Sequence, residues 1–498
     1  MTPLVLRRAV LLAASLLSFS TAAAAPPRTI RPEDYFALEA VSDPRISSDG
    51  ARVAFVLTRV DGAKKQRRSA IWMALADGSR PPWPITTAPQ STTSPRWSPD
   101  GRSLAFLSAR PSEDDSKGAD KNQVHLLSLD GGEARRVTSL EDGVRAFAWS
   151  PDGSRLVCVA RTPPAKDDLP FERTDSRRYT GIFYKLDGSG WDDGRRAHLF
   201  VVEVATGAAR QVTSGNWNDS DPEWSPDGTR IAFVSDRTSG ETDWEGRHSD
   251  VWVVPAAGGA ALRVSDHEEA DTDPAWSPDG RTLAFFGSLA EGDHPKVYLA
   301  PSAGGAPSRL ASPRVDHLAN HLSWEASGRG LTFEAGARGV RHLFRLDLAS
   351  KEVAPVTRGP RHVSQVDVSE KAGRMVYRVN DSNHPDDLYV ADLAGQDERR
   401  LTKFNAPLLD ELHLPAAERI VFKGADGWDI EGYLLRPAGF EAGRKYPMVM
   451  NVHGGPNGMH GHGWLFDAQC LAGRGYAVFM PNPRGSSGYG EAFQRAVA

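Results

Sequence analysis

A five-residue motif, Trp-Ser-Pro-Asp-Gly, recurs along the chain and limits its fold more strongly than any other feature. Complete copies begin at Trp97, Trp149, Trp224 and Trp276, and looser copies occupy residues 46–50, 324–328 and 368–373. Proline fixes the first central position of a turn, aspartate is tolerated at the second, and glycine supplies the positive φ that follows. The motif therefore predicts a tight hairpin, with the tryptophan packing between sheets. Because the aspartate returns in every turn, we interpret it as a turn residue and not as a metal or catalytic site.

Each copy of the motif belongs to a larger unit with four short strands. Apolar or alternating runs follow the turns at residues 53–56, 104–107, 231–234, 283–286 and 331–333. A second strand pair comes later in each unit; in the second unit it covers 124–129 and 135–138, on either side of a Gly-Gly turn. Most units recur about every 50 residues, which is the scale of a β-propeller blade. Counting the units predicts an all-β seven-bladed propeller over residues 46–410.

The third unit carries an insertion. The copies of the motif that begin at Trp149 and Trp224 are about 75 residues apart, whereas most copies are about 50 residues apart. The extra residues lie at about 162–197. This stretch is rich in charged and aromatic residues, among them Arg173, Arg177 and Arg178. Long excursions from a rigid scaffold often carry binding residues, and arginine pairs well with carboxylates. We therefore treat these arginines as candidates for binding a peptide carboxylate; the alternative is an ordinary solvated loop.

From about residue 418 the repeat gives way to a different pattern. A hairpin is predicted around an Ala-Asp-Gly-Trp sequence, followed by a buried strand, a helix that ends at a glycine, and another apolar strand. These elements are expected at 420–423, 429–436, 446–452, 464–472 and 476–480. A strand, a glycine loop, a helix and a further strand form the opening of a wound α/β sheet.

The sequence His453-Gly454-Gly455-Pro456 follows the first apolar strand after this hairpin. An α/β-hydrolase uses a strand that leads into His-Gly-Gly to place a backbone N–H at an oxyanion hole. Such a donor must come close to developing negative charge, and glycines remove the side chains that would obstruct it. The motif alone leaves a plain glycine turn as the alternative.

Three motifs give the last fifty residues a specific resemblance. They are the His453–Pro456 loop, Arg474–Val478, and Asn482–Gly490 followed by Phe493. Together with the repeats before them, they resemble the start of the catalytic domain of the prolyl oligopeptidase family of serine peptidases, in its acylaminoacyl-peptidase and dipeptidyl-peptidase branch. The resemblance implies an incomplete α/β-hydrolase domain over 418–498, capped by the propeller, with Gly455 donating one oxyanion N–H. It also implies peptide substrates and a Ser-Asp-His triad, and neither a cofactor nor a metal is expected.

The resemblance stops short of the catalytic serine. The family's Gly-x-Ser-x-Gly elbow does not occur after Tyr446, where Ser486 and Ser487 are the only serines and belong to a loop motif. We therefore expect the triad to be absent, the catalytic domain to be truncated, and this chain alone to be inactive. About eighty residues of such a domain should expose an edge strand and an apolar face of the sheet.

The N-terminus has the features of a secretory signal. Two arginines precede a short apolar stretch at 9–19, and small residues at 21–25 suit cleavage. The apolar stretch is too short to span a bilayer comfortably, and no other segment is long and apolar enough. Residues 1–25 are predicted to be a signal peptide and 26–45 a lead segment, which places the mature chain in the periplasm or outside the cell.

Composition excludes one class of partner and one kind of scaffold. A net charge of −5 over 498 residues, with no basic stripe, argues against nucleic-acid binding. The two cysteines, Cys158 and Cys470, are too few for a disulfide framework. Cys158 lies in an apolar run, and we expect it to be a small buried hydrophobe.

Two other functions and one other site remain open. A TolB-like periplasmic propeller, acting as a binding or scaffold module, would share the signal and the repeats. That class gives no reason for the motifs after residue 418. An esterase or lipase of the same fold is less consistent with a capping propeller. A metal site is an alternative use of four residues in the last part of the chain, namely His453, His460, His462 and Asp467.

One further loop is a candidate for binding a substrate amine. In the family that the chain resembles, dipeptidyl peptidases hold that amine with acidic residues of the propeller. Glu241, Asp243 and Glu245 occupy a loop with the required charge. A solvated acidic loop is the alternative.

Overall fold

The computed structural model describes residues 27–62, 65–87, 89–111, 121–163, 185–186, 190–237, 248–290, 293–306, 308–314, 319–455 and 457–497. The predicted signal, the three candidate arginines of the insertion and the acidic residues 241, 243 and 245 lie outside the described residues. The helices of the described chain are the 3-10 helix η1 (Pro32–Phe36), α1 (Ala406–Leu409), α2 (Phe466–Gly473) and α3 (Glu491–Arg495). None of them has the length and apolar character that crossing a membrane requires.

The described strands before residue 401 form repeat units of four antiparallel strands. Unit one consists of β1 (Ala40–Ile46), β2 (Arg52–Asp61), β3 (Gln66–Leu75) and β4 (Trp83–Pro84). Unit two consists of β5 (Thr92–Trp97), β6 (Ser103–Ser108), β7 (Gln123–Ser128) and β8 (Arg135–Arg136). Unit three consists of β9 (Ala146–Trp149), β10 (Arg155–Thr162), β13 (Arg196–Glu203) and β14 (Ala209–Gln211). Its insertion holds the strand pair β11 (Lys185–Leu186) and β12 (Gly190–Trp191).

The later units repeat this order. Unit four consists of β15 (Asp219–Trp224), β16 (Arg230–Ser235), β17 (Asp250–Pro255) and β18 (Leu262–Arg263). Unit five consists of β19 (Thr272–Trp276), β20 (Thr282–Gly287), β21 (Lys296–Pro301) and β22 (Arg309–Leu310). Unit six has β23 (Ala319–Trp324), β24 (Gly330–Ala337), β25 (Val340–Asp347) and β26 (Val353–Pro355), and unit seven has β27 (His362–Ser369), β28 (Arg374–Asn380), β29 (Asp387–Asp392) and β30 (Arg399–Arg400). A parallel bridge links β25 and β27, so units six and seven form one eight-stranded sheet.

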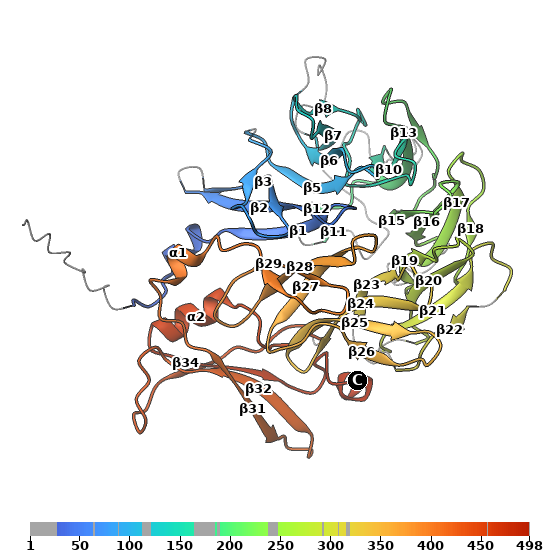
Figure 1. Ribbon diagram of the computed structural model, residues 1–498. Helices are drawn as coiled ribbons and strands as arrows, with labels where there is room; N and C mark the ends of the chain where they lie inside the picture. Colours follow the sequence, from blue (N-terminus) through green and yellow to red (C-terminus); the bar gives the residue numbers. More distant parts are fainter. Residues whose placement is uncertain are drawn as a thin grey trace, which may run out of the picture.

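The units follow one another around a common centre, with the first strand of each unit nearest to it (Figure 1). The apolar runs predicted after the turns lie in β2, β6, β16, β20 and β24, so these strand predictions are confirmed. The central residues of these strands are buried because both faces of each sheet pack against a neighbouring unit. Cys158 in β10 is fully buried, as predicted, and burial raises the pKa of its thiol.

Each Trp-Ser-Pro-Asp-Gly turn is held by its own serine and aspartate. In unit four the Ser225 hydroxyl donates to Asp227 at 2.6 Å, and Asp227 also accepts from the backbone N–H of Thr229 at 3.0 Å. These hydrogen bonds lower the pKa of Asp227 to about 2. The same serine–aspartate contact occurs in the other three complete copies. The repeated aspartate is therefore a turn residue, as predicted.

The tryptophan of the motif ties its unit to the unit before it. Trp276 of unit five donates its indole N–H to the carbonyl of Glu223 in unit four at 3.1 Å. Arg230 of unit four lies 4.7 Å from the centre of the Trp276 ring and donates to the carbonyl of Gly280 at 3.0 Å. The indole bond to the preceding unit recurs at Trp97, Trp149, Trp224 and Trp324. The motif therefore fixes the contact between units as well as the turn within one.

Units one and seven also pack together, although they lie at opposite ends of the repeat. Arg45 of β1 forms an ion pair with Asp367 of β27 at 3.1 Å. A shared buried cluster joins Val41, Ile46 and Phe55 of unit one to Val376, Leu388 and Val390 of unit seven. The first and last units thus make the same kind of apolar contact as consecutive ones.

The C-terminal part forms a separate four-stranded sheet in the order β31-β32-β34-β33. Its strands are β31 (Ala417–Lys423), β32 (Asp429–Leu435), β33 (Met448–Met450) and β34 (Ala477–Asn482). β33 and β34 pair in parallel, and α2 lies between them in the sequence, as in a βαβ unit. Ala468 and Ala472 of α2 pack against Tyr433, Leu435 and Val478 on one face of the sheet. The predicted order of hairpin, strand, helix and strand is therefore confirmed.

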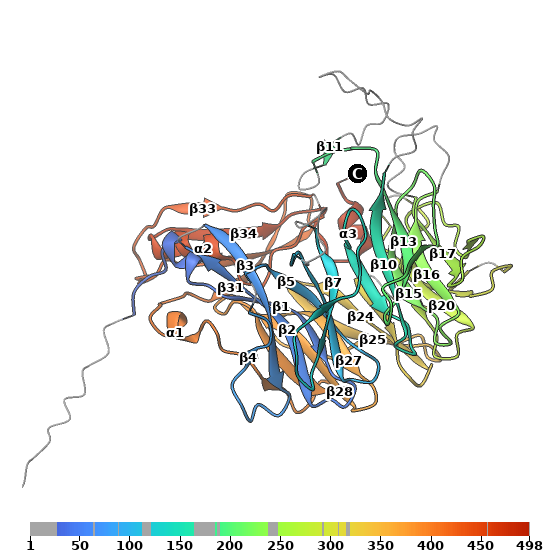
Figure 2. The same ribbon diagram turned by 90° about the horizontal axis from the view of Figure 1, so that it is seen from above.

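The other face of this sheet carries exposed apolar side chains. The register places Phe422, Met448 and Met450 on the face opposite to α2, and they are 42%, 57% and 56% exposed. Among the described strands, β33 is hydrogen-bonded only to β34, and Figure 2 shows it on the outer side of this sheet. The exposed edge strand and apolar face expected from the sequence are present in the structure.

The lead segment brings the two ends of the repeat together. η1 packs against α2 of the C-terminal part through an aromatic contact. Arg28 forms a parallel β-bridge with Leu412. Glu39 and Asn405 exchange two hydrogen bonds, of 2.9 Å and 2.8 Å. The chain therefore enters and leaves the repeat units at one place.

Candidate functional site

The loop after β33 contains Gly455, the predicted oxyanion residue. Its φ is +139°, and a Cβ at this position would meet the backbone nitrogens of Asn457 and Gly458. Glycine is therefore the residue that fits here without strain. Gly455 is exposed, and its N–H makes no hydrogen bond with another described residue. A free backbone donor that no side chain shields is what an oxyanion hole requires.

The first residue of the motif, His453, anchors this loop. Its Nε2 lies 2.9 Å from the Ser486 hydroxyl, and that hydroxyl donates to the carbonyl of Pro483 at 2.6 Å. Because the serine proton is directed at the carbonyl, His453 acts as the donor to Ser486. Ser486 is also fully buried, so a substrate cannot reach it. The pair joins two glycine-rich loops and does not form a nucleophile with its base.

A buried carboxylate supports both loops from behind. Glu431 of β32 accepts hydrogen bonds from the hydroxyls of Tyr433 and Tyr489, at 2.6 Å and 2.9 Å, and from Arg419 Nε at 2.6 Å. Burial alone would raise the pKa of Glu431, but these three donors outweigh it and lower the pKa. A carboxylate with three donors stays charged and holds all of them in fixed positions.

Asn482 links this network to the loop that follows the glycines. It is fully buried at the end of β34 and donates to the Tyr489 hydroxyl at 2.7 Å. Its amide also donates to the carbonyl of His460 and accepts from the His460 N–H, at 2.9 Å and 2.7 Å. Asn482 and Tyr489 both belong to the Asn482–Gly490 motif that the sequence singled out, and the Asn482 side chain thus holds the loop that follows the His453–Pro456 motif.

The same loop rests on units six and seven. The His462 N–H donates to the carbonyl of Gly339, in the turn between β24 and β25, at 2.8 Å. The Trp464 N–H donates to the side chain of Asn380, at the end of β28, at 3.1 Å. A Cβ at Gly339 would overlap the hydroxyl of Tyr433, so the two parts meet where only glycine allows it. The candidate oxyanion loop therefore lies at the contact between the repeat units and the C-terminal sheet.

The structure does not describe all of the other residues that the sequence predicted. Pro456 and the arginines 173, 177 and 178 lie outside the described residues. His453 and His460 stack edge to face at 5.2 Å, and burial lowers the pKa of His460. Within the described residues, no three His, Cys, Asp or Glu side chains gather as the ligands of a metal would.

The supporting residues were not predicted from the sequence. Glu431 and Tyr433 lie in the hairpin strand Asp429–Leu435, which was assigned only as a strand. The sequence does carry one signal for Glu431, because it is an acidic residue within a strand whose adjacent residues are buried. Such a carboxylate needs donors, and the tyrosine two residues on lies on the same face of the strand.

Comparisons with known proteins agree with this geometry. A sequence profile of the prolyl oligopeptidase family matches residues 464–498. The chain is 32% identical over 492 residues to the uncharacterized peptidase YuxL of Bacillus subtilis, a match that covers 94% of the chain and 73% of the relative. It is 25% identical to dipeptidyl-peptidase 5 of Porphyromonas gingivalis, with 94% and 70% covered. The solved structure of Pyrococcus horikoshii acylaminoacyl peptidase superposes with a TM-score of 0.76 at 22% identity, over 94% of this chain and 69% of that one, and this likeness shows the fold.

Proposed function

The chain belongs to the prolyl oligopeptidase family of serine peptidases, and from this premise we propose that its function is to hydrolyse short peptides from the N-terminus. Relatives named dipeptidyl-peptidase 5 support this choice of substrate end. The observation that carries the proposal is the exposed, unshielded N–H of Gly455, held at the contact between the two parts of the chain. Gly455 is assigned as one oxyanion donor, and the Glu431 network as the structure that positions its loop.

We also propose that the seven repeat units are the blades of a closed propeller that limits access to the site. The contacts between units one and seven support closure, and the docking of residues 459–464 on units six and seven supports a site that faces the propeller. A closed ring of this kind admits unfolded peptides and excludes folded proteins. Export to the periplasm or the medium remains a proposal from residues 1–25; N-terminal sequencing of the secreted chain tests it.

We propose that residues 1–498 lack the triad nucleophile and that this chain alone does not catalyse peptide hydrolysis. Ser486 is hydrogen-bonded to His453 in the described site, but it is buried and its hydroxyl donates to a carbonyl. The purified chain should therefore not react with a fluorophosphonate probe, while a serine protease treated in parallel is labelled. Stoichiometric labelling of the chain would contradict this proposal.

Reading the gene beyond the codon for Ala498 tests the peptidase assignment itself. A frame that encodes Gly-x-Ser-x-Gly, then Asp and His, would supply the nucleophile and its partners. Its product should cleave dipeptidyl or N-acetyl-aminoacyl p-nitroanilides. Gly455→Ala keeps the backbone N–H but strains the loop and displaces that donor, so it should lower kcat by about ten-fold or more. Unrelated sequence would instead favour a TolB-like binding module.

A further inference from the structure

One hairpin turn of the propeller is held by hydrogen bonds from the C-terminal part. Arg338 and Gly339 form this two-residue turn between β24 and β25, and their φ angles are +46° and +72°. The Arg338 N–H donates to the carbonyl of Gly488 at 3.0 Å, and the Arg338 carbonyl accepts the Tyr433 hydroxyl at 3.1 Å. The Gly339 carbonyl accepts the N–H of His462 at 2.8 Å. Three of the four backbone polar groups of the turn therefore have an ordinary partner across the junction.

The fourth group of the turn, the N–H of Gly339, has a sulfur atom as its acceptor. It donates to Met459 Sδ at 3.3 Å, and Gly339 is buried. A thioether is a weak acceptor, so this is the weakest of the four hydrogen bonds. Met459 lies four residues after Gly455. The same side chain therefore joins the segment that follows the candidate oxyanion residue to the propeller.

The end of the Met459 side chain is closely enclosed by backbone from both parts of the chain. A Cβ at Gly488 would lie 2.5 Å from the Met459 Sδ, and a Cβ at Gly336 would lie 3.1 Å from its methyl carbon. These two sides leave no room for an additional heavy atom. Met459 is nevertheless partly exposed, so a small molecule in solution can reach its side chain.

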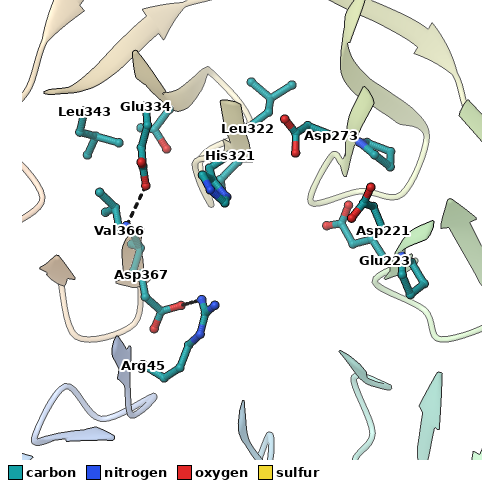
Figure 3. A pocket seen from close by; sticks show the side chains of 15 residues that line it. Arg45, Asp221, Glu223, Asp273, His321, Leu322, Glu334, Leu343, Val366 and Asp367 are labelled. Atoms are coloured by element: carbon teal, nitrogen blue, oxygen red, sulfur yellow. Dashed lines mark hydrogen bonds and ion pairs between the residues drawn. The ribbon is translucent and has the colours of Figure 1, made fainter. Parts of the chain in front are cut away.

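The hairpin that carries this turn is anchored within the propeller. Glu334 of β24 accepts the N–H of Val366 in unit seven at 2.9 Å, beside the cavity shown in Figure 3. β25 also forms the parallel bridge to β27. The hairpin is thus held by its own sheet. A weaker contact at its tip would release the loop of the C-terminal part and would leave the hairpin in place.

We propose that Met459 is an oxidation site, at which a peroxide converts the thioether to a sulfoxide and loosens the candidate oxyanion loop from the propeller. A lone pair of the sulfur attacks one oxygen of hydrogen peroxide, the S–O bond forms and the O–O bond breaks. The proton of the transferred oxygen passes to the departing hydroxide, which leaves as water. The sulfur is thereby oxidised by two electrons and the peroxide is reduced by two.

The added oxygen has no space beside Gly488 and Gly336, so the oxidised side chain has to withdraw from the turn. The buried N–H of Gly339 then loses its acceptor, which is costly. Methionine sulfoxide reductases return the sulfoxide to the thioether, so the contact can form again. This inference goes beyond the proposed function and requires no catalytic serine.

The other described methionines differ from Met459 in exposure, which sets an order of reaction. Met448 and Met450 are more than half exposed and should be oxidised first. Met459 should follow. The last to react should be the three methionines that are at most 2% exposed, namely Met73, Met375 and Met480. Mass spectrometry of peptides from the purified chain, after timed exposure to increasing hydrogen peroxide, measures this order.

Hydrogen exchange before and after oxidation tests the consequence for the junction. Once Met459 is oxidised, exchange in peptides that cover 337–341 and 457–463 should quicken about ten-fold or more, because a buried N–H has lost its acceptor. Exchange in β16 should stay the same. Treatment with the two methionine sulfoxide reductases should restore slow exchange at the turn.

Two variants assign the effect to one sulfur atom. Met459→Leu keeps nearly the same volume without a sulfur, so peroxide should no longer change exchange at the turn. The control, Met448→Leu with Met450→Leu, should keep the full effect and its reversal. If Met459→Leu fails to fold, this control still tests the inference, because Met459 is then the first described methionine to react.

Three results would overturn the inference. They are a Met459 that stays unoxidised until the buried methionines react, unchanged exchange after Met459 is oxidised, and an equal peroxide effect in Met459→Leu. None of them bears on the peptidase assignment, because the fluorophosphonate and gene-reading experiments do not depend on this sulfur.

Discussion

The propeller units and the C-terminal sheet bury apolar side chains to different extents. In the propeller, each sheet packs between two neighbouring sheets. Phe233 of β16 and Phe285 of β20, the second strands of their units, are fully buried. In the C-terminal sheet, α2 covers one face, while Met448 and Met450 on the opposite face are more than half exposed. This difference indicates that contacts between repeats stabilise the propeller. The C-terminal sheet is stabilised instead by its contacts with units six and seven and by the hydrogen bonds of Glu431.

The largest effect should follow from breaking a contact between repeats. Trp276 is 5% exposed and bonds to Glu223 of the preceding unit, so Trp276→Ala leaves a cavity and removes that bond. We expect a loss of about 3–5 kcal/mol in the free energy of unfolding. Trp428→Ala, in the C-terminal hairpin where the ring is 37% exposed, should cost about 1 kcal/mol or less. Urea denaturation followed by circular dichroism measures both; equal losses would contradict the comparison.

The next effect is a pH dependence of stability, which has opposite signs for Glu223 and Glu431 because their pKa values shift in opposite directions. Burial raises the pKa of Glu223 from 4.5 to about 8, against an opposing backbone hydrogen bond from Trp276. The folded state thus favours the neutral acid, so the stability from this group falls as the pH rises from about 4.5 to about 8. Glu223→Gln should remove that loss and stabilise the chain by about 2 kcal/mol at pH 9, with little change at pH 4.

Melting temperatures of the Glu223→Gln variant and the unaltered chain at pH 4, 6 and 9 test this expectation. The difference between them should grow with pH. Glu431 gives the opposite sign: its pKa is lowered, so its contribution is present above about 4.5 and is lost as the pH falls below that value. A Glu223→Gln gain that is equal at all three pH values would show that the carboxylate does not titrate in this range.

A smaller, local effect should follow from weakening the polar network. The Tyr433 hydroxyl lies 2.6 Å from Glu431 and 3.1 Å from the carbonyl of Arg338, and Tyr433→Phe removes both contacts. We expect a loss of about 1–2 kcal/mol that is confined to the C-terminal sheet. Hydrogen exchange should quicken in β32 and β34 but not in β16. Tyr389→Phe is the control, because its hydroxyl has no hydrogen bond among the described residues.

The smallest effect on stability should come from the exposed face. Met448→Lys with Met450→Lys should change the free energy of unfolding by less than about 0.5 kcal/mol, since both side chains are already in solvent. The same change places charge on an open edge strand, which opposes pairing between chains. Light scattering at increasing concentration should show less association than in the unaltered chain. A large loss of stability would mean that this face is covered.

The sequence predicted the propeller strands well because the turn motif carries its own chemistry. Proline, aspartate and glycine act within five residues, so the hairpin at Trp276 follows from local rules alone. Cys158 and the predicted strand at 446–452 were likewise identified from short apolar runs. Cys158 lies in β10, and residues 448–450 of the predicted strand form β33. Local hydrogen bonds and periodicity therefore account for the elements of both parts.

Contacts between distant residues could not be predicted in this way. The bond from Trp276 to Glu223 crosses between two units, and no pattern within one unit indicates it. Glu431 gains its donors from β31, β32 and the loop at Tyr489, which meet only in the folded sheet. Likewise, Asp43 and Asp273 both precede a proline in the first strand of a unit, but among the described residues Asp43 pairs with arginines and Asp273 does not.

The two hydrogen bonds between Glu39 and Asn405 bring the start and the end of the propeller to one point on the C-terminal layer. The two ends lie at hydrogen-bonding distance, so the loops of units two to four can be lengthened or shortened without changing the spacing of the layer that holds the ends. A lineage can thus vary the propeller while the C-terminal layer stays constant. An engineer can use the same junction to vary those loops without disturbing this layer.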